Sequence, residues 1–170
     1  MRAEADPGSA GWKRDLALAL ESRPRLALLG LGSELSGDDA AGMLALGWLE
    51  RLLPPREDVL LLAGSTAPEN FTGQLRQWRP ELLLLLDAAR FRGRVGETRL
   101  LDWDQGAQSW CCTHSLPLEI MLDYLRLDLS CRVLLLGFQA GGTEFGSPPS
   151  PEIITATREM SQWLADFLSN

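Results

Sequence analysis

Histidine and cysteine are scarce in this chain of 170 residues, and that limits the chemistry available to it. His114 is the only histidine. Two of the three cysteines, Cys111 and Cys112, are adjacent, and the third is Cys131. Adjacent cysteines rarely pair with each other, and an odd number leaves one thiol over. The pattern therefore fits a reducing compartment better than a secreted disulfide scaffold.

The chain also lacks a dense cluster of Lys or Arg, and its formal net charge is −7. We therefore expect no nucleic-acid partner. The longest apolar runs, Leu82–Leu86 and Val133–Leu136, are far too short to cross a bilayer. The first residues, Met1–Pro7, are polar and acidic, unlike a signal peptide. These absences predict a cytoplasmic protein with no membrane partner.

Two common catalytic motifs are missing as well. The Gly30-x-Gly32 turn resembles the start of a dinucleotide-binding fingerprint, but Leu35 stands where the third glycine is needed. Asp38 and Asp39 at the following helix start would repel a pyrophosphate, so we predict no nucleotide cofactor. The sequence has no Gly-x-Ser-x-Gly elbow, which argues against a serine hydrolase of that type.

The composition that remains, with 45% hydrophobic and 23% charged residues, is typical of one globular domain. We assign residues 1–24 to an N-terminal extension with a short helix at Trp12–Glu21, and residues 25–170 to an α/β domain. Continuous apolar runs suit strands that are buried on both faces. We predict strands at Leu26–Gly30, Val59–Leu62, Leu82–Leu86, Gly96–Leu101 and Val133–Phe138.

Helical segments alternate with these strands, at about Asp38–Leu53, Glu69–Trp78, Ser115–Leu127 and Glu152–Leu168. Such alternation predicts a single three-layer domain: a mostly parallel, mixed and twisted sheet of about five strands, with helices on both faces. The alternating segment Gly96–Leu101 is expected at an edge of the sheet. Ser115 is expected to cap its helix, with Pro117 in the first turn.

In folds of this class, sites form beyond the carboxyl ends of the strands. Asp87 stands at the end of the predicted strand Leu82–Leu86, and the loop that leads to Asp39 leaves the first strand. Both carboxylates should therefore lie at one rim of the sheet. Together with His114 they would form a plausible three-ligand set for a divalent transition metal.

The residues alone leave other interpretations open. Asp38 and Asp39 could offset the dipole of a helix, and Asp87 could begin a turn. His114 could equally be a half-buried scaffold residue. A cysteine beside His114 raises a nucleophile–base pair or a soft zinc site, although a small buried hydrophobe is the better interpretation of these cysteines.

Five segments of the chain resemble, in order and spacing, motifs of the hydrogenase maturation endopeptidases. They are Leu29–Gly42, Gly64–Asn70, Leu86–Ala89, Thr113–Leu118 and Leu136–Gln139. The similarity extends over roughly Leu26 to Leu168, almost the whole chain. The Ala-Pro-Glu-Asn segment, Ala67–Asn70, is most similar to the branch that acts on hydrogenases of the formate-hydrogenlyase type.

The resemblance implies an aspartic-type or nickel-dependent endopeptidase. Such an enzyme removes a C-terminal extension from the large-subunit precursor of a [NiFe] hydrogenase after nickel insertion. It implies Asp39, Asp87 and His114 as metal ligands, Asp39 and Asp87 as catalytic carboxylates, and Asp38 as a capping residue. The metal would be the nickel of the substrate, so the free enzyme is expected to hold no tightly bound ion. Cd²⁺ or Zn²⁺ could substitute for it.

The chain departs from the family pattern at Ser33, where Asn is usual, and at Cys111 and Cys112, which could add a soft donor near the nickel. Two alternatives remain at this stage. One is a non-catalytic module of the same fold that binds a metal or a partner. The other is a related protease with a different protein substrate.

Overall fold

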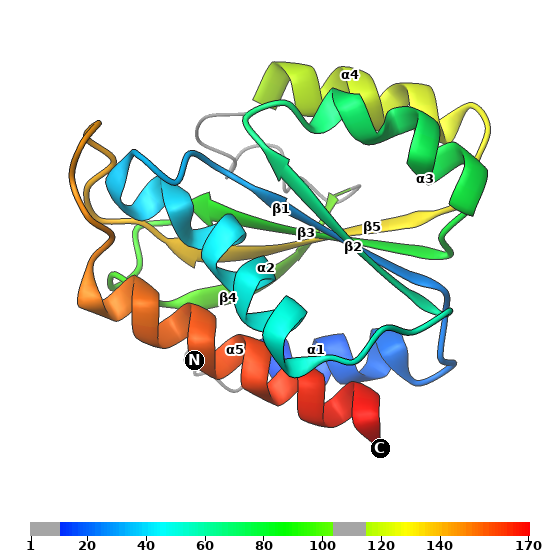
Figure 1. The fold of residues 1–170 in the computed structure, drawn as a ribbon, viewed down its shortest axis with the longest axis horizontal. Helices are drawn as coiled ribbons and strands as arrows, with labels where there is room; N and C mark the ends of the chain where they lie inside the picture. The colour runs from blue at the N-terminus through cyan, green and yellow to red at the C-terminus, as the bar shows by residue number, and fades with distance from the viewer. Residues whose placement is uncertain (1–10, 104–114) are drawn as a thin grey trace, which may run out of the picture.

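A sheet of five strands in the order β2–β1–β3–β5–β4 forms the middle layer of the computed structural model, which describes residues 11–103 and 115–170 (Figure 1). The strands are β1 (Leu26–Leu31), β2 (Val59–Ser65), β3 (Leu82–Ala89), β4 (Thr98–Asp102) and β5 (Arg132–Gln139). Strands β2, β1, β3 and β5 pair in parallel, and β4 runs antiparallel to β5 at one edge. The predicted mixed sheet, with its edge strand near residue 100, is confirmed.

Helices cover both faces of this sheet (Figure 1). Helices α1 (Gly11–Leu20), α2 (Ala41–Leu52) and α5 (Pro151–Ser169) lie on one face. Helices α3 (Thr72–Trp78) and α4 (Ser115–Arg126) lie on the other. The α/β fold with three layers is therefore confirmed for the described residues.

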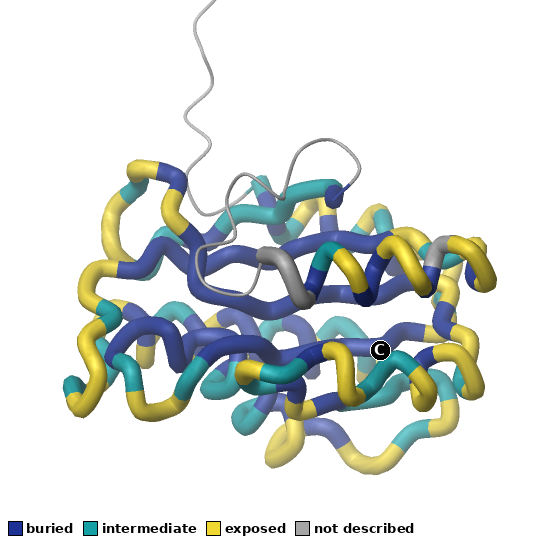
Figure 2. Tube along the Cα trace, turned by 90° about the horizontal axis from the view of Figure 1, so that it is seen from above, coloured by how far each residue is buried: buried dark blue, intermediate teal, exposed yellow. Residues whose placement is uncertain are grey.

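The leucine run of β3 explains how both layers attach to the sheet. Successive side chains of a strand point to opposite faces. Leu82, Leu84 and Leu86 accordingly pack with α1, α2 and α5, whereas Leu83 and Leu85 pack with α3 and α4. The central strands are buried along their length (Figure 2). Burying both faces is the expected behaviour of parallel strands that read as unbroken apolar runs.

The helix predicted in the N-terminal extension is present as α1, which begins and ends one residue earlier than expected. Its buried residues Trp12, Leu16 and Leu20 belong to the same core cluster as α2 and α5. The ring of Trp12 meets Trp163 of α5 edge-on, at 5.2 Å between centroids. This helix therefore packs on the core rather than over the loops at the strand ends.

Several element boundaries differ from the prediction. The predicted helices at Asp38 and Glu69 each begin with a 3-10 turn, η1 (Gly37–Ala40) and η2 (Pro68–Phe71), before α2 and α3. Asp87 lies inside β3 rather than after it, because β5 continues the pairing and places Gly137 opposite Asp87. Helix α4 begins at Ser115 itself, the residue expected just before it, and the side chain of Ser115 lies outside the described residues.

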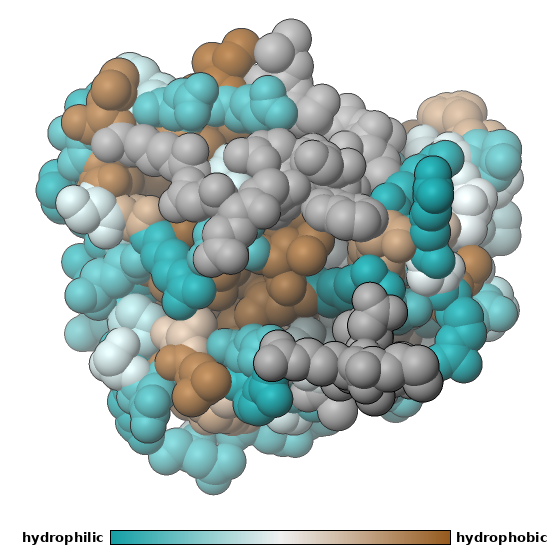
Figure 3. Space-filling model, turned by 180° about the vertical axis from the view of Figure 1, so that it is seen from behind, coloured by the Kyte–Doolittle hydropathy of each residue, from teal (hydrophilic) through white to brown (hydrophobic). Residues whose placement is uncertain are grey.

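No helix within the described segments is long and apolar enough to cross a membrane. Hydrophobic side chains gather near the middle of the face that lies behind the view of Figure 1, with hydrophilic residues along part of their border (Figure 3). Single apolar side chains at the surface are ordinary in globular proteins, so only a set with a structural context calls for an explanation.

The packing of β3 gives a stability prediction. Leu84 is fully buried, so Leu84→Ala should lower the free energy of unfolding by about 2–5 kcal/mol, through lost transfer energy and a residual cavity. Urea denaturation followed by circular dichroism measures this. Leu18→Ala, at a site 63% exposed on α1, should change stability by no more than about 0.5 kcal/mol. Equal losses in both variants would contradict the assigned packing.

Candidate active site

The border between β1 and β3 is the point where the strand order reverses. From β1 the chain crosses to β2 on one side of the sheet, and from β3 it proceeds to β4 and β5 on the other side. The helix after β1, α2, covers one face, and α4, which leads into β5, covers the opposite face. Connections that diverge in this way leave a crevice at the carboxyl ends of the two strands, where α/β proteins bind ligands.

Asp39 and Asp87 flank this border. Gly30 of β1 pairs with Leu86 of β3, so Asp87 is the next residue of β3 beyond that pair. Asp39 lies in η1, which follows the loop after β1 and contacts β3. Asp39 is 4% exposed and Asp87 is fully buried. The structure therefore brings these two predicted residues to the same end of the sheet, the one formed by the carboxyl ends of the parallel strands.

Gly42 in the first turn of α2 explains why η1 lies so close to the strands. A Cβ atom at this position would collide with the carbonyl oxygens of Leu31 and Leu86. The start of α2 therefore lies directly across the ends of β1 and β3, a position that a larger residue would prevent. Asp39, three residues earlier, is carried to the same place.

The loop between β1 and η1 orients the carboxylate of Asp39. Its Oδ2 accepts a hydrogen bond from the backbone N–H of Ser33 at 2.7 Å. Gly32 has a φ of +109°, and a Cβ there would collide with the carbonyl oxygen of Asp39, so this turn requires glycine. Oδ1 of Asp87 accepts from the backbone N–H of Ala88 at 2.8 Å. Backbone donors thus fix both carboxylates.

Asp38 has a different role from the one that the family resemblance of the chain implied. Its carboxylate accepts hydrogen bonds from the backbone N–H groups of Gly141 and Ser150, both at 2.7 Å. Neither η1 nor α2 has a side-chain cap at its N-terminus. The expectation that Asp38 caps its own helix is therefore wrong. This buried residue, 1% exposed, instead fastens the loop between β5 and α5 to η1.

The end of β2 reaches the same edge through the segment Gly64–Asn70. Gly32 donates its backbone N–H to the carbonyl oxygen of Ser65 at 3.0 Å. Ser65 has a φ of +49°, an uncommon conformation for a residue other than glycine. The chain then turns into η2, where Pro68 is buried. This motif therefore borders the loop that orients Asp39.

The third predicted ligand, His114, lies outside the described residues, as do Cys111 and Cys112. The described segments contain no group of three or more His, Cys, Asp and Glu residues that could hold a metal ion. The three-ligand set and the possible soft donors therefore remain predictions. Cys131, just before β5, is a free thiol, and burial raises its pKa to about 11. That supports a packing role for this cysteine.

Gln139, at the end of β5, is a buried residue for which we predicted no role. Its Oε1 accepts from the backbone N–H groups of Phe91 and Gly93, at 2.9 and 3.1 Å, and its Nε2 donates to the carbonyl oxygen of Ala140. These bonds hold the loop that follows β3, the strand that contains Asp87. Its position at the end of an apolar run could have indicated this role, because a buried side-chain amide needs hydrogen-bond partners.

The loop after β3 is also closed by Glu97. Burial would raise the pKa of Glu97, but hydrogen bonds from the Arg99 side chain and the Arg94 backbone N–H outweigh it and keep this pKa below its usual value. Glu97 is therefore ionised at neutral pH. It anchors the turn that leads from β3 to β4.

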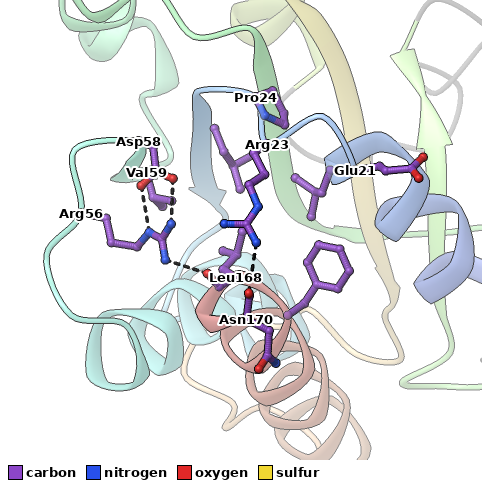
Figure 4. A pocket seen from close by; sticks show the side chains of 11 residues that line it. Glu21, Arg23, Pro24, Arg56, Asp58, Val59, Leu168 and Asn170 are labelled. Carbon is purple, nitrogen blue, oxygen red and sulfur yellow. Dashed lines mark hydrogen bonds and ion pairs between the residues drawn. The ribbon is translucent and has the colours of Figure 1, made fainter.

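A cavity of about 310 Å³ lies at the opposite end of the sheet, beside the first residues of β1 and β2 (Figure 4). Arg56 donates to both carboxylate oxygens of Asp58, which lowers the pKa of Asp58, and also donates to the carbonyl oxygen of Leu168. Arg23 donates to the backbone oxygen of Asn170. These contacts tie α5 to the strand starts, so this cavity is separate from Asp39 and Asp87.

A family model described as hydrogenase maturation protease matches residues 46–166 of the chain. The chain belongs to the hydrogenase maturation protease family. It is 32% identical over 144 residues to the hydrogenase 3 maturation protease of Escherichia coli K12, covering 84% of this chain and 90% of that protein. Members of this family are peptidases, and therefore hydrolases.

Solved structures of the hydrogenase maturation protease family have the same fold. The crystal structure of the maturation protease HycI from Thermococcus kodakarensis KOD1 matches with a TM-score of 0.81 at 30% identity, covering 92% of this chain and 99% of that one. The solution structure of the endopeptidase HycI from Escherichia coli matches with a TM-score of 0.70 at 30% identity, covering 85% and 92%. The resemblance to this family seen in the motifs is confirmed.

The position of Asp38 gives a second prediction. Asp38→Ala removes the acceptor for two backbone N–H groups and should lower the free energy of unfolding by about 2–4 kcal/mol. Hydrogen exchange should show lost protection at the Gly141 amide. Asp128→Ala is the control, because Asp128 forms an exposed ion pair with Arg76, and exposed ion pairs contribute little to stability. Unchanged protection at Gly141 would contradict the fastening role.

Proposed function

We propose that this protein removes a C-terminal extension from the large-subunit precursor of a [NiFe] hydrogenase once nickel has been inserted. One observation carries the proposal: in a chain of the maturation protease family, two buried carboxylates, Asp39 and Asp87, flank the switch point of the sheet. The similarity to the hydrogenase 3 maturation protease supports a substrate of the formate-hydrogenlyase type. A cytoplasmic location fits this role.

The nickel ion of the precursor is the recognition element in this proposal. Asp39, Asp87 and His114 supply two carboxylates and one imidazole, a donor set that suits nickel and leaves coordination positions for the precursor's own ligands. The hydrogen bond from the Ser33 N–H holds the carboxylate of Asp39 in one orientation. The free enzyme then carries no tightly held metal, and Cd²⁺ or Zn²⁺ can take the place of nickel.

Holding the precursor through its nickel ion keeps the scissile peptide beside the two carboxylates, which makes the hydrolysis effectively intramolecular. A nickel-polarised carbonyl and a carboxylate that accepts a proton from the attacking water are the two contributions this site can make. We assign the base role to the Asp39–Asp87 pair. The aspartic and nickel-dependent descriptions of the family then refer to one and the same centre.

Substitution of the carboxylates tests the catalytic assignment. Asp39→Asn and Asp87→Asn, made separately, should each lower the processing rate of a nickel-loaded precursor by at least about 100-fold, because a positioned base contributes that much or more. Gel-shift analysis of the truncated large subunit measures this rate. Asp128→Asn, on an exposed ion pair, is the matched control and should process normally. Normal processing by both site variants would rule out the proteolytic assignment to this centre.

Nickel dependence tests the recognition step separately. Precursor without nickel should remain uncut by the wild-type enzyme, and addition of nickel through the insertion machinery should restore cleavage. Isothermal titration should detect no tight binding of Ni²⁺ to the free enzyme. Efficient cleavage of the nickel-free precursor would leave the protease assignment intact and overturn nickel recognition. If the precursor binds but is never cleaved, the protein is a non-catalytic module.

A further inference from the structure

Two large hydrophobic side chains are exposed on the loops beside the candidate active site. Leu35 is 63% exposed on the loop between β1 and η1, and Phe145 is 81% exposed on the loop between β5 and α5. These two loops lie side by side at the end of the molecule where η1 begins (Figure 1). We infer that Leu35 and Phe145 form a docking surface for an extended segment of the hydrogenase precursor, an inference that rests on the proposed function.

Hydrogen bonds join the two loops into one unit. The backbone N–H of Gly146 donates directly to the carbonyl oxygen of Leu35 at 2.7 Å. The N–H of Gly37 donates to the carbonyl oxygen of Ser147 at 3.0 Å. The two bonds to the Asp38 carboxylate complete the unit. Leu35 and Phe145 are therefore displayed on a backbone that is already ordered, which reduces the entropy lost when a partner binds.

This docking surface is continuous with the candidate active site. Leu35 follows Ser33, whose N–H orients Asp39, by two residues. The η1 turn that contains Asp39 also contains Asp38, the anchor of the Phe145 loop. A precursor chain that places its scissile bond at Asp39 and Asp87 has to pass over the loops that surround these residues. The two loops that carry Leu35 and Phe145 offer it apolar contact area.

Charge indicates which segment fits. A glutamate precedes each hydrophobic residue, Glu34 before Leu35 and Glu144 before Phe145, and both glutamates are exposed. Arg90 donates to the Thr143 hydroxyl at 3.2 Å and adds one positive charge beside the loop. The chain as a whole carries −7. The occupant is therefore a segment of the precursor with hydrophobic side chains next to basic ones, held by apolar contact and by complementary charge.

A double variant tests the apolar part. Leu35→Gln/Phe145→Gln should raise KM for the nickel-loaded precursor by roughly 10–100-fold, because buried apolar anchors dominate binding energy, while kcat stays within about twofold. The matched control is Leu18→Gln/Leu127→Gln, at residues 63% and 86% exposed elsewhere on the surface. Thermal unfolding should show that both double variants remain folded, as expected for exposed sites.

The outcomes separate the inference from the proposed function. An unchanged KM in the Leu35/Phe145 variant, or an equal rise in the control, overturns the docking surface while precursor processing by the wild type still stands. A wild-type dimer that dissociates in the Leu35/Phe145 variant assigns the surface to a second copy and also overturns it. A wild-type enzyme that never cleaves nickel-loaded precursor removes the proposed function first, before any variant is compared.

The charged part has its own test. Glu34→Gln/Glu144→Gln should raise KM several-fold at low ionic strength, on the order of 3–10-fold, and the difference from wild type should shrink at 0.5 M salt through screening. Glu50→Gln/Glu159→Gln, at exposed sites on α2 and α5, is the control and should leave KM unchanged. A KM that falls in the Glu34/Glu144 variant would assign the surface to an acidic segment and contradict the inference.

Discussion

The contact between the first turn of α2 and the ends of β1 and β3 fixes the geometry of the site. Gly42 has no side chain, so α2 can begin directly over the carbonyl oxygens of Leu31 and Leu86. This contact sets the position of η1 relative to β3 and thereby the position of Asp39 relative to Asp87. The loops that reach the same edge from β2 and β5 are arranged around it. A modest change in this contact would alter the spacing of both carboxylates at once.

Two adjacent aspartates divide the work at this edge. A buried carboxylate is costly unless hydrogen bonds compensate it. Asp38 receives two backbone N–H groups of the β5–α5 loop and serves the architecture. Asp39 receives the N–H of Ser33, and the short η1 turn directs the two side chains differently. Asp38 thereby joins the loop between β5 and α5 to the η1 turn that contains Asp39, so a structural residue supports the candidate site through this loop.

The strands and helices could be read from the sequence because each leucine run has a single compatible environment. A run such as Leu82–Leu86 must be buried on both faces, and this alone predicts a parallel sheet between two helical layers. The end of β3 could not be read in this way. The extension of β3 to Ala89 depends on pairing with β5, which lies some 50 residues later, and the residues around Asp87 do not indicate this extension. The role of Asp38 was missed for the same reason, since its partners Gly141 and Ser150 are distant in sequence. The motif order located Asp39 and Asp87 at one rim because strand ends converge in parallel sheets. His114 precedes a helix that lies between strands, and the sequence gives no comparable constraint on its position.

The carboxylates at the two ends of the sheet, where the parallel strands begin and where they end, have different hydrogen-bond donors. At the edge where β1 and β2 begin, Arg56 is matched by the carboxylate of Asp58, so that charges of opposite sign close the surface. At the edge where η1 lies, the hydrogen bonds described for Asp38, Asp39 and Asp87 come from backbone N–H groups. An amide has no net charge, so it orients a carboxylate without forming an ion pair with it. The described contacts therefore differ in kind: backbone amides orient the carboxylates at one end of the sheet, and a guanidinium binds a carboxylate at the other. The carboxylates of the proposed nickel site, Asp39 and Asp87, lie at the end of the sheet where backbone amides orient them, whereas the cavity beside Arg56 and Asp58 lies at the opposite end.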